Sequence, residues 1–313
     1  MVLCLGLSPA LQRTLVLDTF SEGGVNRIRE VFISPGGKSV NTGLALAKLG
    51  RTPVITGLNG GAEGRLVAEH LKRNGATCAF TRTPWSTRTC TTIVNEASGC
   101  ITELVEEAGR PTRALLQAFE RRNRALLRRA RLCFICGTLP PGVPGDFWAR
   151  FARAAHRGGI PLLIDSHAAP VMRVLASQPL LVKMNVQELE KTLAPCPSEA
   201  AVIRASRELL GGGAAWVLIT NGVEPSILTG RDRSAWRVTP PKVSGVRSPV
   251  GSGDCVNAGI VDALLGGQQM PTAVRFGLAC GTANALTYCP ADFDPARARA
   301  LASACTVQQL RKK

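Results

Sequence analysis

The sequence contains Ser248-Pro249-Val250-Gly251-Ser252-Gly253-Asp254 directly before an apolar segment, Cys255–Val261. Because glycine lets the backbone turn sharply, this stretch predicts a tight turn that leads into a buried helix. The N–H groups at such a helix start, together with the helix dipole, favour a bound anion. Asp254 is then either a general base that takes a proton from a hydroxyl beside that anion, or an ordinary helix N-cap.

A second glycine turn lies near the start of the chain, in Ser34-Pro35-Gly36-Gly37-Lys38-Ser39-Val40-Asn41. Its Gly-Lys-Ser is similar to the end of a P-loop, but that motif needs a glycine at position 32, where this chain has Phe32. Two interpretations remain open. The segment is either a cradle for an anion or a sugar, or a plain strand-to-helix turn.

Outside the two turns, strand-like and helical patterns alternate, which indicates a parallel β-sheet covered by helices. We expect strands near 2–7, 54–57, 132–136, 160–164, 180–184 and 215–220, helices over 40–49 and 64–74, a hairpin over 224–239, and mostly helix from Asp254 onward. Segments 14–17, 25–33 and 78–106 have the pattern of more exposed strands. We therefore expect residues 12–33 and 78–106 to form a small separate sheet on one α/β/α domain that spans residues 1–313.

The composition agrees with this architecture. Apolar residues make up 45% and aromatic residues only 4% of the 313 positions, so Val, Leu, Ile and Ala must supply the core. No apolar run reaches the roughly 18 to 20 residues of a membrane span, and no basic stretch precedes the apolar N-terminus as in a signal peptide. We expect a cytoplasmic protein without membrane contact.

The 11 cysteines are scattered through apolar segments, which favours free buried thiols over a disulfide framework. Cys133 and Cys136 form the one C-x-x-C pair, on a predicted strand where residues three apart point to opposite faces. No second pair follows at zinc spacing. The cysteines therefore do not indicate a metal or redox site.

The net charge of +16 suggests anionic partners, such as phosphorylated metabolites, nucleotides or nucleic acid. The densest basic cluster is Arg121–Arg131, where leucines recur at helical spacing. It is either the solvated face of an amphipathic helix, which we favour, or a nucleic-acid surface. Aromatic residues that could stack on bases do not interleave with these arginines, so we expect no nucleic-acid partner.

Five further segments occur in a fixed order along the chain, namely Gly137–Gly142 (GTLPPG), Asp165-Ser166, Lys183–Leu189 (KMNVQEL), Thr220–Gly222 (TNG) and Arg275–Ala279 (RFGLA). Together with the two glycine turns, they resemble the PfkB, or ribokinase-like, family of carbohydrate kinases over essentially the whole chain. Ser8–Gln12 approximates the N-P-A-x-D opening of the branch that contains 1-phosphofructokinase, tagatose-6-phosphate kinase and the minor 6-phosphofructokinase.

The resemblance implies a three-layer α/β/α ribokinase-like domain whose small β-sheet is a lid that closes over the sugar. It implies ATP-dependent, Mg²⁺-dependent phosphorylation of a ketohexose phosphate such as fructose 1-phosphate, fructose 6-phosphate or tagatose 6-phosphate. It also implies a homodimer formed through the lid. A kinase for an unphosphorylated sugar or nucleoside, and a non-catalytic sugar-phosphate-binding protein, are the alternatives.

The resemblance assigns roles to individual residues. The catalytic base is Asp254, and the anion hole is formed by Gly251, Ser252 and Gly253. Sugar is bound by Gln12, Gly36, Gly37, Lys38 and Asn41, and the existing phosphate by Arg27 and Arg88. ATP is bound by Lys183, Asn185, Thr220, Gly222 and Asn284, and Glu188 holds Mg²⁺ through water. On residue type alone, Arg88 could equally be an exposed strand residue, Glu188 a helix-surface charge and Asn284 a packing residue.

Three positions depart from the family pattern. Gln12 replaces the aspartate that grips sugar hydroxyls, Ser39 replaces a glycine, and Met184 replaces a proline. An amide at position 12 can donate and accept hydrogen bonds, but it lacks the charge that strengthens them. The first two departures lie on the substrate side, so the sequence indicates a kinase more firmly than it indicates a particular sugar.

Overall fold

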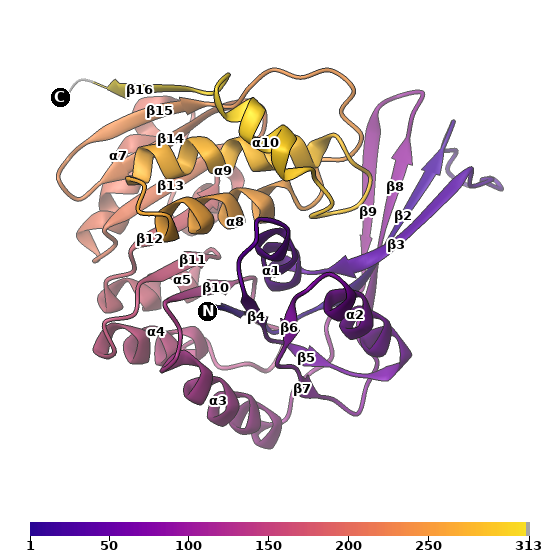
Figure 1. Cartoon of the computed structure of the whole chain (residues 1–313), viewed down its shortest axis with the longest axis horizontal. Coiled ribbons are helices and arrows are strands. Elements are labelled where there is room, and N and C mark those ends of the chain that lie inside the picture. Colours follow the sequence, from indigo (N-terminus) through magenta and orange to yellow (C-terminus); the bar gives the residue numbers. More distant parts are fainter. Residues whose placement is uncertain (311–313) are drawn as a thin grey trace.

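The structure is a computed structural model that describes residues 1–310 and arranges them around one large sheet (Figure 1). This sheet has ten strands in the spatial order β16-β15-β14-β13-β12-β11-β10-β1-β4-β6. In chain order these are β1 (Val2–Leu5), β4 (Pro53–Ile55), β6 (Thr77–Cys78), β10 (Leu132–Cys136), β11 (Leu162–Asp165), β12 (Leu181–Asn185), β13 (Trp216–Asn221), β14 (Glu224–Gly230), β15 (Ala235–Thr239) and β16 (Thr306–Leu310).

Seven neighbouring strands of this sheet are parallel, namely β6, β4, β1, β10, β11, β12 and β13. The strands β14, β15 and β16 continue the sheet in antiparallel pairs. Apolar side chains line both faces of the central strands, as expected for a sheet that is covered on both sides. In β1, Val2 and Cys4 pack in one core layer, whereas Leu3 and Leu5 pack in the other. The expected α/β/α architecture is therefore confirmed.

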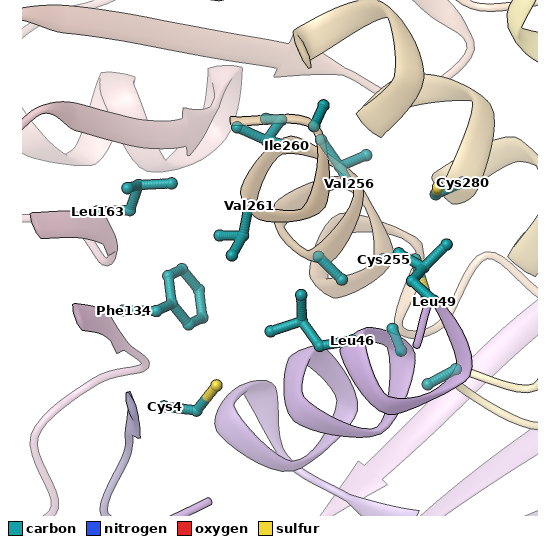
Figure 2. Packing of buried hydrophobic residues seen from close by; sticks show 14 of the residues in the cluster. Cys4, Leu46, Leu49, Phe134, Leu163, Cys255, Val256, Ile260, Val261 and Cys280 are labelled. Atoms are coloured by element: carbon teal, nitrogen blue, oxygen red, sulfur yellow. The ribbon is translucent and has the colours of Figure 1, made fainter. Parts of the chain in front are cut away.

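Two layers of helices cover the sheet. One face is covered by α1 (Lys38–Lys48), α2 (Gly61–Arg73), α8 (Ser252–Leu265), α9 (Met270–Ala285) and α10 (Pro295–Ala302). The other is covered by α3 (Arg113–Leu127), α4 (Phe147–Arg157), α5 (Ala169–Val174) with the 3₁₀ turn Leu175–Ser177, α6 (Val186–Thr192) and α7 (Glu199–Gly211). Figure 2 shows Leu46 of α1 and Val261 of α8 packed near Phe134 of β10.

A separate four-stranded sheet lies at one end of the molecule (Figure 1). It consists of β2 (Ala10–Leu17), β3 (Glu30–Gly36), β8 (Arg88–Asn95) and β9 (Cys100–Val105) in the order β3-β2-β8-β9. The parallel pairing of β2 with β8 joins segments that are far apart in the sequence. Two short strands, β5 (Leu58–Asn59) and β7 (Thr81–Arg82), pair with each other in a third sheet.

One strand was predicted with the wrong start. The strand expected over 25–33 begins only at Glu30, because the Asn26 amide hydrogen-bonds the N–H and C=O of Ser21 at 2.8 Å and forms a turn. From Asp254 onward the described part of the chain is mostly helical, as expected, and Thr306–Leu310 adds an edge strand on β15. All 11 cysteines are free, and Cys133 and Cys136 lie in opposite core layers. No helix within residues 1–310 is long and apolar enough to cross a membrane.

Candidate active site

The predicted site residues converge at the carboxyl ends of the central strands. Asp165 ends β11 and Asn185 ends β12, and the starts of α1 and α8 face them. Crevices at this edge of a parallel sheet are the usual ligand sites of such folds. Lys38 at the start of α1 contacts Asp165 across 127 positions of the sequence, so the two glycine turns flank one site.

Asp254 lies in the first turn of α8 and is only 7% exposed. Its Oδ2 accepts a hydrogen bond from Asn41 Nδ2 at 2.8 Å, which links α8 to α1. Burial raises the pKa of Asp254 to about 6; the nearby Asp165 adds to the rise, while Lys38 and the Asn41 hydrogen bond oppose it. The carboxylate is therefore ionised at neutral pH and remains a usable proton acceptor.

The turn before α8 requires glycine at position 251. Gly251 has φ 79°, and a Cβ there would lie 2.7 Å from Pro290 Cβ. The N–H groups of Ser252 and Asp254 donate to the carbonyls of Pro249 and Gly251 at 3.0 and 3.1 Å. The N–H groups of Gly251 and Gly253 have no acceptor among residues 1–310. Two free donors therefore lie at the positive end of a 14-residue helix, where an anion is favoured.

Asn284 lies behind this turn and is fully buried. Its Nδ2 donates to the carbonyl of Val250 at 2.9 Å and to Ser252 Oγ at 3.1 Å, and its Oδ1 accepts from the Ala291 N–H at 2.7 Å. These three hydrogen bonds tie the turn before α8 to α9 and to the loop after it. A direct contact of Asn284 with ATP stays a prediction.

Asp165 is the centre of a charged network and has no exposed surface. Lys38 Nζ lies 2.5 Å from one oxygen, and Lys183 Nζ and Asn257 Nδ2 lie 2.8 and 2.7 Å from the other. Burial by itself would raise the pKa of Asp165, but the charges of Lys183 and Lys38 outweigh it and hold the pKa below its ordinary value. The network fixes both ammonium groups beside the glycine turn.

Lys38 also pairs with Glu188, whose Oε1 lies 3.1 Å from its Nζ. Burial favours the neutral amine, yet the carboxylates of Asp165 and Glu188 more than compensate and raise the pKa of Lys38. Lys38 begins α1 directly after Gly37, which has φ 99°. A Cβ atom on residue 37 would lie only 2.7 Å from the Ser8 carbonyl oxygen, so only glycine fits there. The glycine turn thus brings the lysine to the site without a clash.

On the nucleotide side, the predicted residues are neighbours across two strands. Asn185 lies opposite Thr220 in the register of β12 and β13. Asn185 and Glu188 form a capping box at the start of α6, with hydrogen bonds of 2.8 and 2.9 Å. Gly222 lies in the exposed β13–β14 turn. Lys183, Asn185, Glu188 and Thr220 are therefore brought together, and Gly222 lies just beyond them.

On the acceptor side, Gln12 and Arg88 come from the four-stranded sheet. Gln12 is 5% exposed, its Nε2 donates to Thr92 Oγ1 at 2.8 Å, and its Cβ packs against Gly36. Arg88 donates to the Glu106 carbonyl at 3.1 Å, and its buried Nε has no partner among residues 1–310. Arg88 also lines a cavity of about 210 Å³ together with Lys38 and Glu188.

Arg27 is the one predicted site residue that the structure leaves apart from the others. It lies in the exposed loop before β3, at the opposite end of that strand from Gly36. Arg27 lies nine positions before Gly36, which corresponds to at most about 30 Å along a fully extended chain. A contact of Arg27 with the substrate of its own chain stays a prediction.

Three further side chains belong to the site. Asp165 stood out in the sequence only as part of a short motif, and Asn257 only as a helix residue after the glycine turn. His167 lines the 210 Å³ cavity, and its Nδ1 is buried, without a hydrogen bond and 3.8 Å from Glu188 Oε1. Asn257 lies one helical turn after Asp254, at spacing i+3, and this spacing is the signal that could have identified it.

Comparisons with solved structures identify the fold. A possible 1-phosphofructokinase from Thermotoga maritima is 23% identical, with a TM-score of 0.91 over 99% of both chains. Phosphofructokinase-2 from Escherichia coli in complex with fructose-6-phosphate is 24% identical, with a TM-score of 0.83 over 96% of this chain and 97% of that one. Arabidopsis thaliana ribokinase complexed with ribose and ATP is 18% identical, with a TM-score of 0.74 over 96% and 97% of the two chains.

The sequence comparison agrees with the fold. The family model described as pfkB family carbohydrate kinase matches residues 1–295, which include both glycine turns and all the residues of the site. These features together show that the chain belongs to the pfkB family of carbohydrate kinases.

Proposed function

We propose that this kinase transfers the γ-phosphoryl group of ATP to a hydroxyl of a ketohexose phosphate such as fructose 1-phosphate, fructose 6-phosphate or tagatose 6-phosphate. The observation that carries the proposal is the position of Asp254, buried beside the free N–H groups of Gly251 and Gly253. A carboxylate with a pKa of about 6 is ionised at neutral pH and basic enough to accept the hydroxyl proton. Asp254 is the proposed general base.

The glycine turn supplies the second element of the reaction. Negative charge on the transferred phosphoryl group would be stabilised by the free N–H groups at the start of α8. Lys183 Nζ lies 3.1 Å from the position of a Cβ on Gly253, so its positive charge is next to the same turn. Base and anion hole are therefore adjacent, as an in-line transfer requires.

We assign the nucleotide and Mg²⁺ to the region of Lys183, Asn185, Thr220 and Glu188. Residues 1–310 contain no group of three His, Cys, Asp or Glu side chains that could hold a metal by themselves. We assign Mg²⁺ mainly to the phosphates and to water, with Glu188 as an outer partner. When bound, Mg²⁺ neutralises charge on the ATP phosphates.

A phosphorylated acceptor is supported by the 210 Å³ cavity next to the first glycine turn, at the start of α1. Arg88 and Lys38 line it, and the unpartnered Nε of Arg88 is a donor without an acceptor. A guanidinium group suits a phosphate because its donors match two oxygens at once. We assign the existing phosphate of the sugar to Arg88.

We further propose that the four-stranded sheet is the lid of this site and that its outer face forms a homodimer. Ile33 of β3 and Leu104 of β9 lie in one row across the sheet, and both are more than half exposed, at 55% and 56%. Val31, two residues before Ile33, is 48% exposed on the same face. Exposed apolar side chains that gather on one sheet face are a feature of protein–protein contacts.

An ADP-release assay with ATP and Mg²⁺ tests the proposal. The acceptors are fructose 1-phosphate, fructose 6-phosphate and tagatose 6-phosphate, with unphosphorylated fructose, ribose and adenosine as comparisons. Turnover of a ketose phosphate alone is the expected result. Turnover of only an unphosphorylated compound would refute the acceptor class and the role of Arg88. Binding of sugar phosphate without turnover of any acceptor would indicate a binding protein.

A further inference from the structure

Tyr288, the one tyrosine in the sequence, lies between α9 and α10 and contacts the lid. Its carbonyl accepts a hydrogen bond from Thr14 Oγ1 of β2 at 3.2 Å. Its ring stacks on Phe32 of β3, with centroids 5.2 Å apart and planes 22° apart. Its hydroxyl donates a hydrogen bond to Glu96, directly after β8. One residue of the main domain therefore contacts the lid at three places.

Arg247 completes this contact from the main domain. Its Nη1 lies 3.4 Å from Glu96 Oε1 and donates to the Tyr288 hydroxyl at 3.2 Å, and its guanidinium carbon is 5.4 Å from the centroid of the Tyr288 ring. Arg29 of the lid holds the other oxygen of Glu96 at 2.7 Å. The Glu96 carboxylate therefore contacts two guanidinium groups and accepts a hydrogen bond from one hydroxyl. Its side chain is 28% exposed, so these partners replace much of the water that would surround a surface acid.

The two main-domain residues of this contact flank the glycine turn. The N–H groups of Arg247 and Ser248 donate to the Ala285 carbonyl at 2.8 and 3.2 Å. Tyr288 precedes Pro290 by two residues, and Pro290 packs directly against Gly251. The loops that hold the lid are therefore the loops that form the walls of the anion hole.

We propose that Glu96, Arg247 and Tyr288 form a lid latch that fixes the lid relative to the glycine turn and thereby positions the acceptor. This inference rests on the proposed function, because the lid carries Gln12 and Arg88 whereas the turn carries Asp254. The three latch residues are positioning residues, since they act through the groups that contact the substrate. Misplacement of a reacting hydroxyl by a fraction of an ångström lowers the rate of transfer.

Hydrogen exchange on the full-length protein without substrate tests the latch directly. The variants are Tyr288→Phe, which keeps the ring stacked on Phe32, and Glu96→Gln, which removes the charge. The control is Glu199→Gln, which breaks the Arg237 ion pair at 2.7 Å on another part of the surface. We expect the amides of β2 and β8 to exchange about threefold to tenfold faster in both latch variants, as for one lost hydrogen bond.

The same variants should leave exchange in the ten-stranded sheet unchanged, and the control should leave lid exchange unchanged. Lid exchange at the wild-type rate in both latch variants would overturn the proposal. This outcome does not depend on catalysis. If no acceptor in the panel is phosphorylated, the proposed function fails, while the exchange experiment still decides whether the latch exists.

Kinetics then separate positioning from mere structural support. With the acceptor found in the panel, KM for that acceptor should rise about threefold to tenfold in each latch variant, while KM for ATP stays at the wild-type value. Tyr288→Ala, which also removes the ring, should have a larger effect than Tyr288→Phe. A lower Tm with both KM values unchanged would mean that the latch supports the fold alone and would overturn its positioning role.

Discussion

Asp254→Asn is the sharpest perturbation of the proposed reaction, because it replaces one carboxylate oxygen by an NH₂ group and changes little else in the shape of the side chain. The remaining oxygen can still accept the Asn41 hydrogen bond that now measures 2.8 Å. The general base is lost, and general base catalysis contributes about 10²- to 10⁴-fold. We expect kcat to fall by about that factor while ATP still binds. The assay is coupled ADP release with the acceptor found in the panel.

Stability should change in the opposite direction. Burial raises the pKa of Asp254 from 3.8 to about 6, so the folded protein binds this proton more tightly than the unfolded chain does. The charged carboxylate is therefore destabilising above pH 6, and that penalty fades as the pH falls from 6 towards 3.8. The difference corresponds to about 3 kcal/mol at most, at about 1.36 kcal/mol per pH unit. The variant also loses the attraction between the charges of Asp254 and Lys38, which reduces the gain in stability.

Asp254→Asn should therefore have a higher Tm at pH 8 than the wild type, together with the loss of turnover. In the wild type, kcat/KM should fall below about pH 6 as the carboxylate takes up its proton. Asp262→Asn, on the same helix and paired with Arg51 at 2.5 Å, is the matched control and should keep turnover. Turnover of Asp254→Asn within tenfold of the wild type would refute the assignment of the base.

Three other variants test the remaining parts of the site. Gly251→Ala should lose about 1–3 kcal/mol of stability and most of its turnover, because alanine is strained at φ 79° and meets Pro290; an unchanged Tm and rate would contradict this. Arg88→Gln should raise KM for a phosphorylated acceptor about 10- to 100-fold with KM for ATP unchanged, and equal effects on both substrates would remove its phosphate role. Ile33→Glu should convert a dimer into the 33.1 kDa monomer in light scattering, whereas a dimer that persists would exclude this face.

The glycine turns show how far local sequence can predict a site. Gly36-Gly37-Lys38 and Gly251–Asp254 were expected to be turns that start helices, and both are. These predictions succeed because a positive φ and a helix start depend on a few neighbouring residues. Six of the seven parallel strands were also located within about two residues, because their apolar runs are buried on both faces, whereas the short strand β6 was not predicted for this sheet.

Elements that depend on distant partners were harder to predict. Thr306–Leu310 has no strong strand pattern, and it becomes a strand because β15 offers a free edge. Asn26 delays the start of an expected strand through side-chain hydrogen bonds to Ser21 that the apolar pattern does not reveal. The contacts of Tyr288 could not be predicted either, since its partners Phe32 and Glu96 are more than 190 positions away.

The sequence by itself determined the family, the two glycine turns and the candidate base, because these depend on short motifs and on the order in which they occur. Only the tertiary structure decided that Lys38 meets Asp165 and Glu188, which are 127 and 150 positions away. Likewise, the pKa of Asp254 follows from burial between α1 and α8, not from its neighbours in the chain. The physical reason is that backbone preferences are local, whereas charge, burial and alignment arise where distant segments pack together.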